Sequence, residues 1–74
     1  MLPKEMIRDK DMIRNKLIYY HEEEESVHLT LDRRFYNGMI INILDDHFLF
    51  DDERLGQIII FFDELISIEK RLAR

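Results

Sequence analysis

The sequence lacks cysteine altogether and contains only one proline and two glycines among its 74 residues. Without cysteine, the chain has no disulfide bond and no thiolate ligand for a structural zinc ion. A chain of this length buries only about 60–65% of the surface that its unfolded form exposes, so its own core gives marginal stability. We therefore expect a single domain over residues 1–74 that gains stability by forming a homo-oligomer.

Long apolar runs are also absent from the sequence. A membrane-spanning helix needs about 20 consecutive apolar residues, and the chain has no run of that length and none that suits a signal peptide. Together with the lack of cysteine, which fits a reducing compartment, this favours a cytoplasmic protein without a membrane partner. The sequence contains no phosphate-binding loop, nucleophile elbow or HExxH motif, so we expect neither an enzyme nor a bound cofactor.

Hydrophobic residues make up 46% of the chain and charged residues 36%, which leaves few uncharged polar residues. This usage is typical of thermophile proteins. The formal net charge of −5 disfavours strong non-specific binding to a phosphate backbone, because such binding needs clustered Lys and Arg. The adjacent pair Arg33 and Arg34 is a local basic patch, while the other positive charges lie mostly in residues 4–16 and 70–74.

Residues 3–20 show the pattern of an amphipathic helix. Pro3 suits a first helical turn, and apolar side chains recur on one helical stripe at Met6, Ile13, Leu17 and Tyr20. We expect the helix to end at residue 20 or 21, because the run Glu22–Glu25 would oppose the helix dipole at a C-terminus. The acidic run itself is interpreted as a solvated loop.

From Val27 onward the apolar period changes to two, which predicts strands. Five short strands are expected between residues 26 and 69, at residues 27–31, 35–44, 48–50, 57–62 and 65–68. Gly38 in the second strand predicts a sharp bend or a close backbone approach. Such strands can curl into a small closed barrel, with residues 70–74 as a tail. As an alternative, residues 17–21 could form a strand paired with residues 27–31.

Acidic residues border the third predicted strand on both sides, and they invite a metal-site or acid–base interpretation. They are Asp45 and Asp46, next to His47, and then Asp51, Asp52 and Glu53. The intervening strand separates the two groups by roughly 13–15 Å, which is too far for them to share one ion. We interpret them as turn residues and expect no metal site.

With these elements in place, the chain resembles the Sm/LSm family over about residues 3–69, as a divergent member. The first family motif is a strand, an Asp-Gly-Arg-like turn, an aromatic residue, a glycine, an apolar strand and an aspartate. It is matched here by Val27, Leu29, Asp32, Arg34, Phe35 or Tyr36, Gly38, Ile40, Ile43 and Asp45. Arg33 replaces the turn glycine, and one extra residue lies between Gly38 and Asp45.

The second family motif is an apolar strand, Arg-Gly, Asp-Asn and a last apolar strand. It is matched here by Leu55, Gly56, Ile58, Ile59, Ile60, Asp63, Leu65, Ile66 and Ile68. Phe61 and Phe62 replace the Arg-Gly pair. The resemblance implies an N-terminal helix and a strongly bent five-stranded antiparallel barrel of the Sm-like or SH3-like kind, with Gly38, Asp45 and Gly56 as structural residues.

The resemblance also implies a ring of about six or seven subunits that binds RNA in its pore. Phe48 or Leu49 stands where the family has a base-binding Asn. His47 and Phe48 offer aromatic faces near this position, and Arg33 and Arg34 offer positive charge, so these four residues are the candidate RNA contacts.

The run from Gln57 to Phe62 contains neither Lys nor Pro, and it would invite aggregation as an exposed strand edge. We expect it to pair head to tail with residues 65–68 of a neighbouring copy and to close a ring. The predicted interface residues are Ile58, Ile59, Ile60, Phe61, Phe62, Leu65, Ile66 and Ile68. Two functions follow: a ring-forming Sm-like protein that binds RNA weakly or with altered specificity, or an Sm-like or SH3-like scaffold for protein assembly without a nucleotide pocket.

Overall fold

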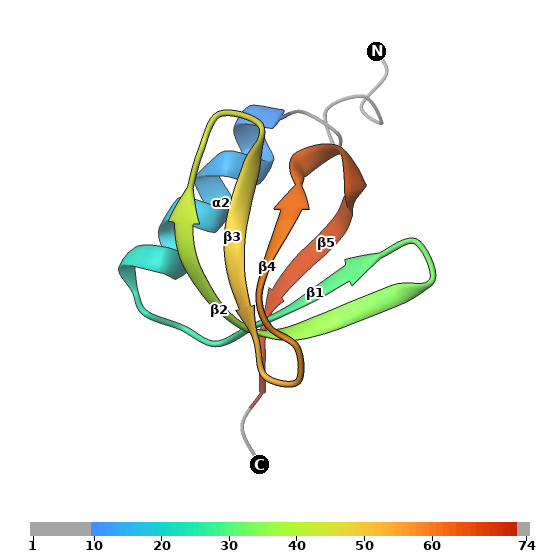
Figure 1. The fold of residues 1–74 in the computed structure, drawn as a ribbon. Helices are drawn as coiled ribbons and strands as arrows, with labels where there is room; N and C mark the ends of the chain where they lie inside the picture. Colours follow the sequence, from blue (N-terminus) through green and yellow to red (C-terminus); the bar gives the residue numbers. More distant parts are fainter. Residues whose placement is uncertain (1–9, 73–74) are drawn as a thin grey trace.

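The computed structural model describes residues 10–72 and contains one helix and five strands (Figure 1). The helix α2 (Lys10–Glu22) is followed by β1 (Val27–Leu31), β2 (Arg34–Ile43), β3 (His47–Asp52), β4 (Gly56–Phe61), the 3-10 helix η1 (Phe62–Glu64) and β5 (Leu65–Lys70). The predicted order of an N-terminal helix and five antiparallel strands in a mainly β fold is confirmed.

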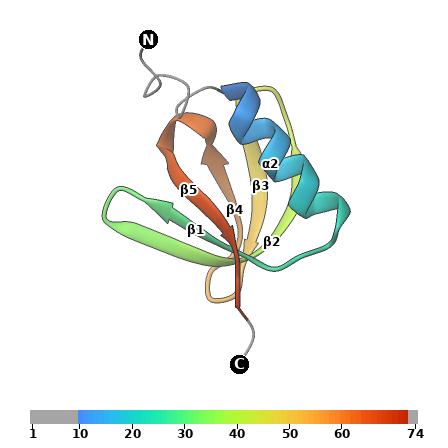
Figure 2. The ribbon, with the colours of Figure 1, turned by 180° about the vertical axis from the view of Figure 1, so that it is seen from behind.

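The five strands form one curved sheet in the order β4-β3-β2-β1-β5, and all four neighbouring pairs are antiparallel. β4 and β5 are the two edges, and within the described residues no ladder joins them. Figures 1 and 2 show these two strands running in opposite directions on either side of η1. The sheet is open, so the closed barrel predicted from the sequence is not confirmed.

The helix α2 lies across the sheet against β2 (Figure 2). Its Leu17 is wholly buried, while Ile13 and Tyr20 pack against the core from the same helical stripe. The alternative strand at residues 17–21 is therefore wrong, because helical spacing is what brings these three side chains to one surface. Residues 3–9 of the predicted helix lie outside the described residues.

The helix ends two residues later than Tyr20, at Glu22. His21 Nδ1 lies 3.1 Å from the carbonyl oxygen of Ile40, which ties the last turn to β2. Glu24 then adopts a left-handed conformation with φ of 55° and reverses the chain toward β1. This tertiary contact outweighs the unfavourable effect of acidic residues at the helix C-terminus.

The core consists of alternate side chains of the curved strands, closed on one side by the helix. Its buried hydrophobic residues are Leu17, Val27, Leu29, Leu31, Ile40, Phe48, Phe50, Ile60, Phe62, Leu65 and Ile68. The period of two predicted for residues 27–31 is seen in β1, where buried and half-buried side chains alternate. In β3 the same alternation turns Phe48 and Phe50 inward and leaves His47 and Leu49 on the outer face.

Gly38 lies where three strands meet closely, opposite Val27 of β1 and Asp52 of β3. A Cβ atom added at Gly38 would overlap the carbonyl oxygen of Asp51 and would lie 3.2 Å from the Cα of Asp52. The β2–β3 ladder also shifts register between Ile40 and Asn42. Both features accompany strong local curvature of the sheet.

Candidate functional site

The turns before β3 and after β4 meet at one end of the molecule. The backbone N–H of Phe62 donates to the carbonyl oxygen of Asp46 at 3.0 Å. His47 pairs with Phe61 across the β3–β4 ladder, and their rings lie 5.3 Å apart at an angle of 43°. His47 Nδ1 is 2.7 Å from the Asp46 carboxylate. This end therefore presents two partly exposed aromatic faces, held by the turn backbone.

Negative charge dominates the side chains around these rings. The hydrogen bond from His47 is the main cause that holds the pKa of the Asp46 carboxyl below its ordinary value, although desolvation acts to raise it. Asp45, Asp63 and Glu64 add further carboxylates nearby in the chain. The arrangement suits stacking on a planar group better than binding a phosphate.

The helix α2 carries Arg14 to the same end of the molecule. Its Nη2 donates to the carbonyl oxygen of Asp45 at 2.6 Å, and its guanidinium lies 5.2 Å from the centre of the Phe62 ring. Local motif spacing could not predict this residue, because it comes from α2 and only the tertiary fold carries it to the turn.

Arg33 and Arg34 lie at the turn of the β1–β2 hairpin. Arg33 has φ of 68°, the left-handed conformation that glycine prefers, and the Arg34 guanidinium lies 6.0 Å from the centre of the Tyr36 ring. A groove of about 520 Å³ separates this turn from η1, lined by Leu31, Asp32, Arg33, Arg34, Asp63, Glu64 and Ile66. His47 is not among the groove residues, so the candidate RNA contacts are not gathered in one pocket.

Phe48, the fourth candidate RNA contact, is wholly buried. Its ring packs near Phe50 and Phe62, at centroid distances of 6.3 and 6.2 Å. This side chain offers no face to a ligand in the folded protomer, and we leave it out of the proposed site. The reason is its position in the β3 alternation, which directs it into the core.

Asp52 anchors the β3–β4 turn at the other end of these strands, where it is the last residue of β3. It is only 2% exposed, and its carboxylate accepts backbone N–H bonds from Asn37 at 3.2 Å and from Arg54 and Leu55 at 2.9 Å each. Burial raises the pKa of this carboxyl, but the three backbone bonds and the nearby Arg54 charge together lower it below its ordinary value. The turn then closes through Gly56, with φ of 84°.

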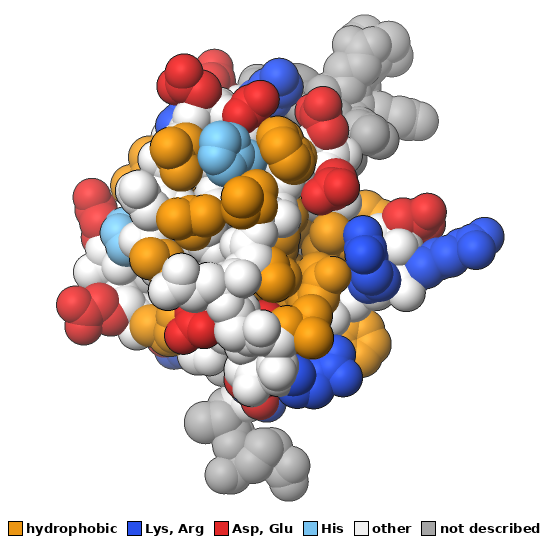
Figure 3. Space-filling view, viewed as in Figure 1, with side chains coloured by type: hydrophobic (Ala, Val, Ile, Leu, Met, Phe, Trp, Pro, Cys, Tyr) orange, Lys and Arg blue, Asp and Glu red, His pale blue; other side chains and the backbone are white. Residues whose placement is uncertain are grey.

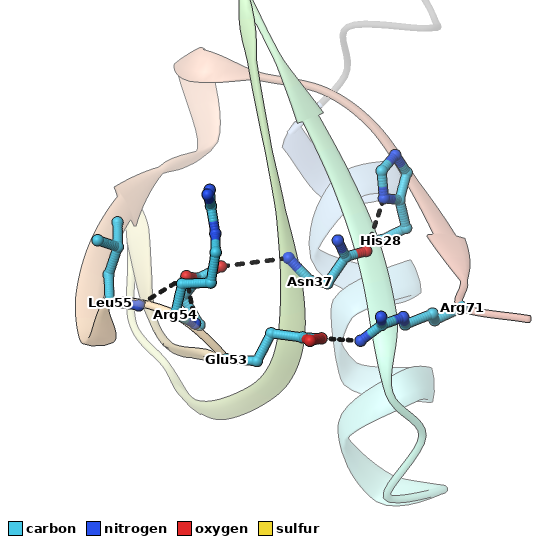
Figure 4. A network of polar contacts seen from close by, with 7 residues as sticks. His28, Asn37, Glu53, Arg54, Leu55 and Arg71 are labelled. Atoms are coloured by element: carbon cyan, nitrogen blue, oxygen red, sulfur yellow. Dashed lines mark hydrogen bonds and ion pairs between the residues drawn. The ribbon is translucent and has the colours of Figure 1, made fainter. Parts of the chain in front are cut away.

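The same end carries two further polar contacts, shown in Figure 4. His28 Nδ1 lies 2.7 Å from Asn37 Oδ1, and the Arg71 guanidinium forms an ion pair with Glu53. Sequence reasoning interpreted the acidic residues here only as turn residues and missed the buried role of Asp52. Within residues 10–72, no three His, Asp or Glu side chains come together in a way that could hold a metal ion.

Apolar side chains are exposed along both free edges of the sheet. On β4, Ile59 is 56% exposed and Phe61 45%; on β5, Ile66 is 62% exposed. Figure 3 shows hydrophobic side chains gathered over β3 and β4, with acidic side chains along the rim. Of the other predicted interface residues, Ile58 is half-buried, and four lie in the protomer's own core: Ile60, Phe62, Leu65 and Ile68.

A second apolar surface lies on the β5 side. A groove of about 280 Å³ runs between α2 and β5, lined by Met12, Ile13, Lys16, Leu65, Ile66, Ser67 and Ile68.

Comparison of the chain with protein-family models, curated proteins and solved structures found no match. No helix among the described residues has both the length and the apolar character needed to span a membrane.

Proposed function

We propose that the chain is a self-associating module of Sm-like architecture, whose copies join head to tail through the β4 edge of one and the β5 edge of the next. The observation that carries this proposal is the open sheet, which leaves two different strand edges unpaired, each beside exposed apolar side chains. Two different edges make a heterologous contact, which closes into a ring when the rotation permits. A ring of about six or seven copies is the expectation from the family resemblance.

Burial of apolar side chains supports the same pairing. The junction covers Ile66 on the β5 edge and Ile59 on the β4 edge and so removes apolar area from water. Such burial stabilises the assembly by about 25 cal/mol per Å². Each junction would therefore add stability that a core of this size lacks.

The test is light scattering after size exclusion, at tens of micromolar protein. We expect a mass that is a multiple of 9.1 kDa. Ile66→Lys should shift the protein toward the monomer, with an apparent dissociation constant raised about 10- to 100-fold, because a charge enters an apolar junction. Phe35→Lys is the matched control, since Phe35 is similarly exposed at 57% but lies away from both edges. A parent protein that stays monomeric would contradict the proposal.

RNA binding is the second candidate function, and the partly exposed aromatic pair at His47 and Phe61 favours it. Titration of oligo-U and oligo-A, followed by fluorescence anisotropy at two salt concentrations, measures it. A phosphate-driven complex weakens as salt rises. We expect the double variant His47→Ala with Arg34→Ala to lose about 10-fold in affinity, since stacking contributes roughly 1–3 kcal/mol per base.

Arg54→Ala is the control for this double variant, because Arg54 is exposed on the β3–β4 turn, at the other end of β3. An unchanged RNA affinity in the double variant would place any RNA elsewhere. A parent protein that assembles but binds neither oligonucleotide would favour the alternative function, an assembly that acts as a scaffold for protein partners.

A further inference from the structure

Leu72 is the most exposed large apolar side chain among the described residues, at 80%. It follows two basic residues, Lys70 at the end of β5 and Arg71. We propose that these three residues, the basic segment 70–72, dock in an apolar groove with an acidic rim on a second copy of the chain. An apolar side chain beside two positive charges matches such a groove in both respects.

The groove lies between the end of α2 and β2, and its volume is about 290 Å³. Apolar side chains and carboxylates line this α2–β2 groove, from Tyr20, Met39, Ile40, Glu22, Glu24 and Glu25. Met39 is 37% exposed, so the apolar part of the groove is in contact with solvent. His21 also lines the groove, where its Nδ1 lies 3.1 Å from the Ile40 carbonyl oxygen. The groove therefore offers apolar area next to negative charge.

The carboxylates of the α2–β2 groove can receive a cation from outside the protomer. Glu22 and Glu24 are exposed, and neither forms an ion pair within residues 10–72. Glu25 pairs with Lys70 of its own chain at 3.6 Å, and both side chains of this pair are partly exposed. Surface ion pairs of this kind contribute little to stability, so Lys70 can exchange its partner for a carboxylate of another copy at small cost.

The strand β1 keeps the basic segment apart from the β2 side of the groove in the same chain. Val27 of β1 pairs with β2 on one side and with Lys70 of β5 on the other, and neighbouring strands lie about 4.7–4.9 Å apart. The Arg71 guanidinium forms an ion pair with Glu53 of the β3–β4 turn, and the chain then leaves the sheet (Figure 1). The exposure of Leu72 agrees with this path. A copy that fills its groove therefore receives the segment of another copy.

Two copies related by a two-fold axis can each give and receive a basic segment. The contact between Lys70 and Glu25 shows that the segment and the rim of the groove lie side by side in each protomer. Two copies that face each other at this end therefore bring each segment to the opposite groove, an isologous contact that closes at the dimer. The groove belongs to α2 and β2, so this contact does not depend on the proposed head-to-tail junction of β4 and β5.

Sedimentation equilibrium of the full chain in an Ile66→Lys background measures this contact, because that substitution should weaken the head-to-tail junction. At about 500 μM, where an interface this small should associate measurably, we expect a monomer–dimer equilibrium that stops at twice the 9.1 kDa of the chain. The dissociation constant should rise with salt, because exposed charges carry part of the contact.

Two variants in this background test the two sides of the contact. Leu72→Glu brings a negative charge to the acidic rim and should raise the dissociation constant at least about 10-fold. Glu22→Lys reverses one charge of the groove and should weaken the homodimer to a similar extent. Both side chains are exposed, so neither change should affect folding. Leu44→Glu is the matched control, because Leu44 is an exposed leucine just after β2, away from the groove, and should leave the equilibrium unchanged.

An equimolar mixture of the Leu72→Glu and Glu22→Lys chains identifies the partners directly. In a mixed dimer, the acidic variant segment meets the groove that carries the added lysine, and the unchanged segment meets the unchanged groove. We therefore expect the mixture to dimerise about as well as the Ile66→Lys background does, although each variant alone stays monomeric.

The other outcomes separate this inference from the proposed function. A purely monomeric Ile66→Lys chain at the same concentration overturns the docking contact and leaves the head-to-tail assembly of the parent protein standing. A dimer that Leu72→Glu does not weaken, or a mixture that fails to dimerise, overturns the assignment of segment and groove. A salt-sensitive dimer in a parent protein that forms no larger assembly supports the inference and contradicts the head-to-tail assembly.

Discussion

Gly38 is the residue at which the backbone itself limits substitution. Any Cβ at this position meets the carbonyl group of Asp51 on the neighbouring strand. Gly38→Val should therefore lower the free energy of unfolding by about 2–3 kcal/mol, as overpacking in a tight site does. Denaturant midpoints measure this change.

Gly56→Ala is a useful comparison for Gly38→Val. A Cβ at Gly56 meets no atom within 4 Å, so its cost comes only from the positive φ of 84° and should be about 1 kcal/mol. Equal midpoints for Gly38→Val and the parent protein would contradict the close approach of β2 and β3.

Asp52 makes stability depend on pH with a definite sign. Its folded-state pKa lies below the ordinary value of 3.8, so the stability that its charge provides is present above that value and is lost as pH falls through the folded pKa. Asp52→Asn keeps the size but weakens the acceptor for three N–H groups, and it should cost about 1–3 kcal/mol at pH 7.

Urea midpoints between pH 7 and pH 2 measure the contribution of Asp52. The Asn variant should show a shallower loss of stability on acidification than the parent protein does. Asp51→Asn is the matched control, because Asp51 is exposed. This variant should change the free energy of unfolding by less than about 0.5 kcal/mol. Parallel acid profiles for Asp52→Asn and the parent would contradict the assigned role.

At the scale of elements, α2 makes its deepest contact with the core through one side chain. Leu17 is wholly buried, whereas Lys16 beside it is exposed. Leu17→Ala should destabilise the protein by about 2–5 kcal/mol, the usual range for a buried leucine, while Lys16→Ala should have little effect on unfolding. Thermal melts of the two variants compare them, and similar melting temperatures would show that the helix is not packed as described.

The element types could be predicted from periodicity, since β1 alternates strictly and the helical stripe through Leu17 and Tyr20 has a spacing that no strand reproduces. Strand ends were predicted less well. β3 and β5 each extend two residues further than Phe50 and Ile68, because pairing with a neighbouring strand keeps polar residues in the ladder regardless of their own preference.

The candidate site was harder to predict than the fold, for two physical reasons. Whether Phe48 or His47 faces outward depends on the phase of the alternation, which the ladder sets. Arg14 and Asp52 act through backbone groups of distant residues, and no local motif records such contacts. The αL conformation of Arg33 likewise follows from the tight turn and not from the preference of arginine.

For the whole molecule, the sheet order determines which strand completes the fold. β1 pairs with β5 although β2, β3 and β4 lie between them in the chain, whereas β1, β2 and β3 each pair with the next strand through short turns. Closing the long loop carries the larger entropic cost. The β2–β3–β4 meander should therefore form first, with β5 arriving after the main barrier.

Rapid-mixing kinetics would reveal this order, in an Ile66→Lys background so that association does not contribute. Ile60→Val, in the core of β4, should mainly slow refolding, while Ile68→Val, in the core of β5, should mainly speed unfolding.

Until β5 arrives, the edge of β1 stays open to pairing with β5 of another copy. The strand that closes the protomer is thus also the one whose delay would allow two chains to exchange it, so refolding at high concentration should yield swapped dimers that dilution alone separates only slowly.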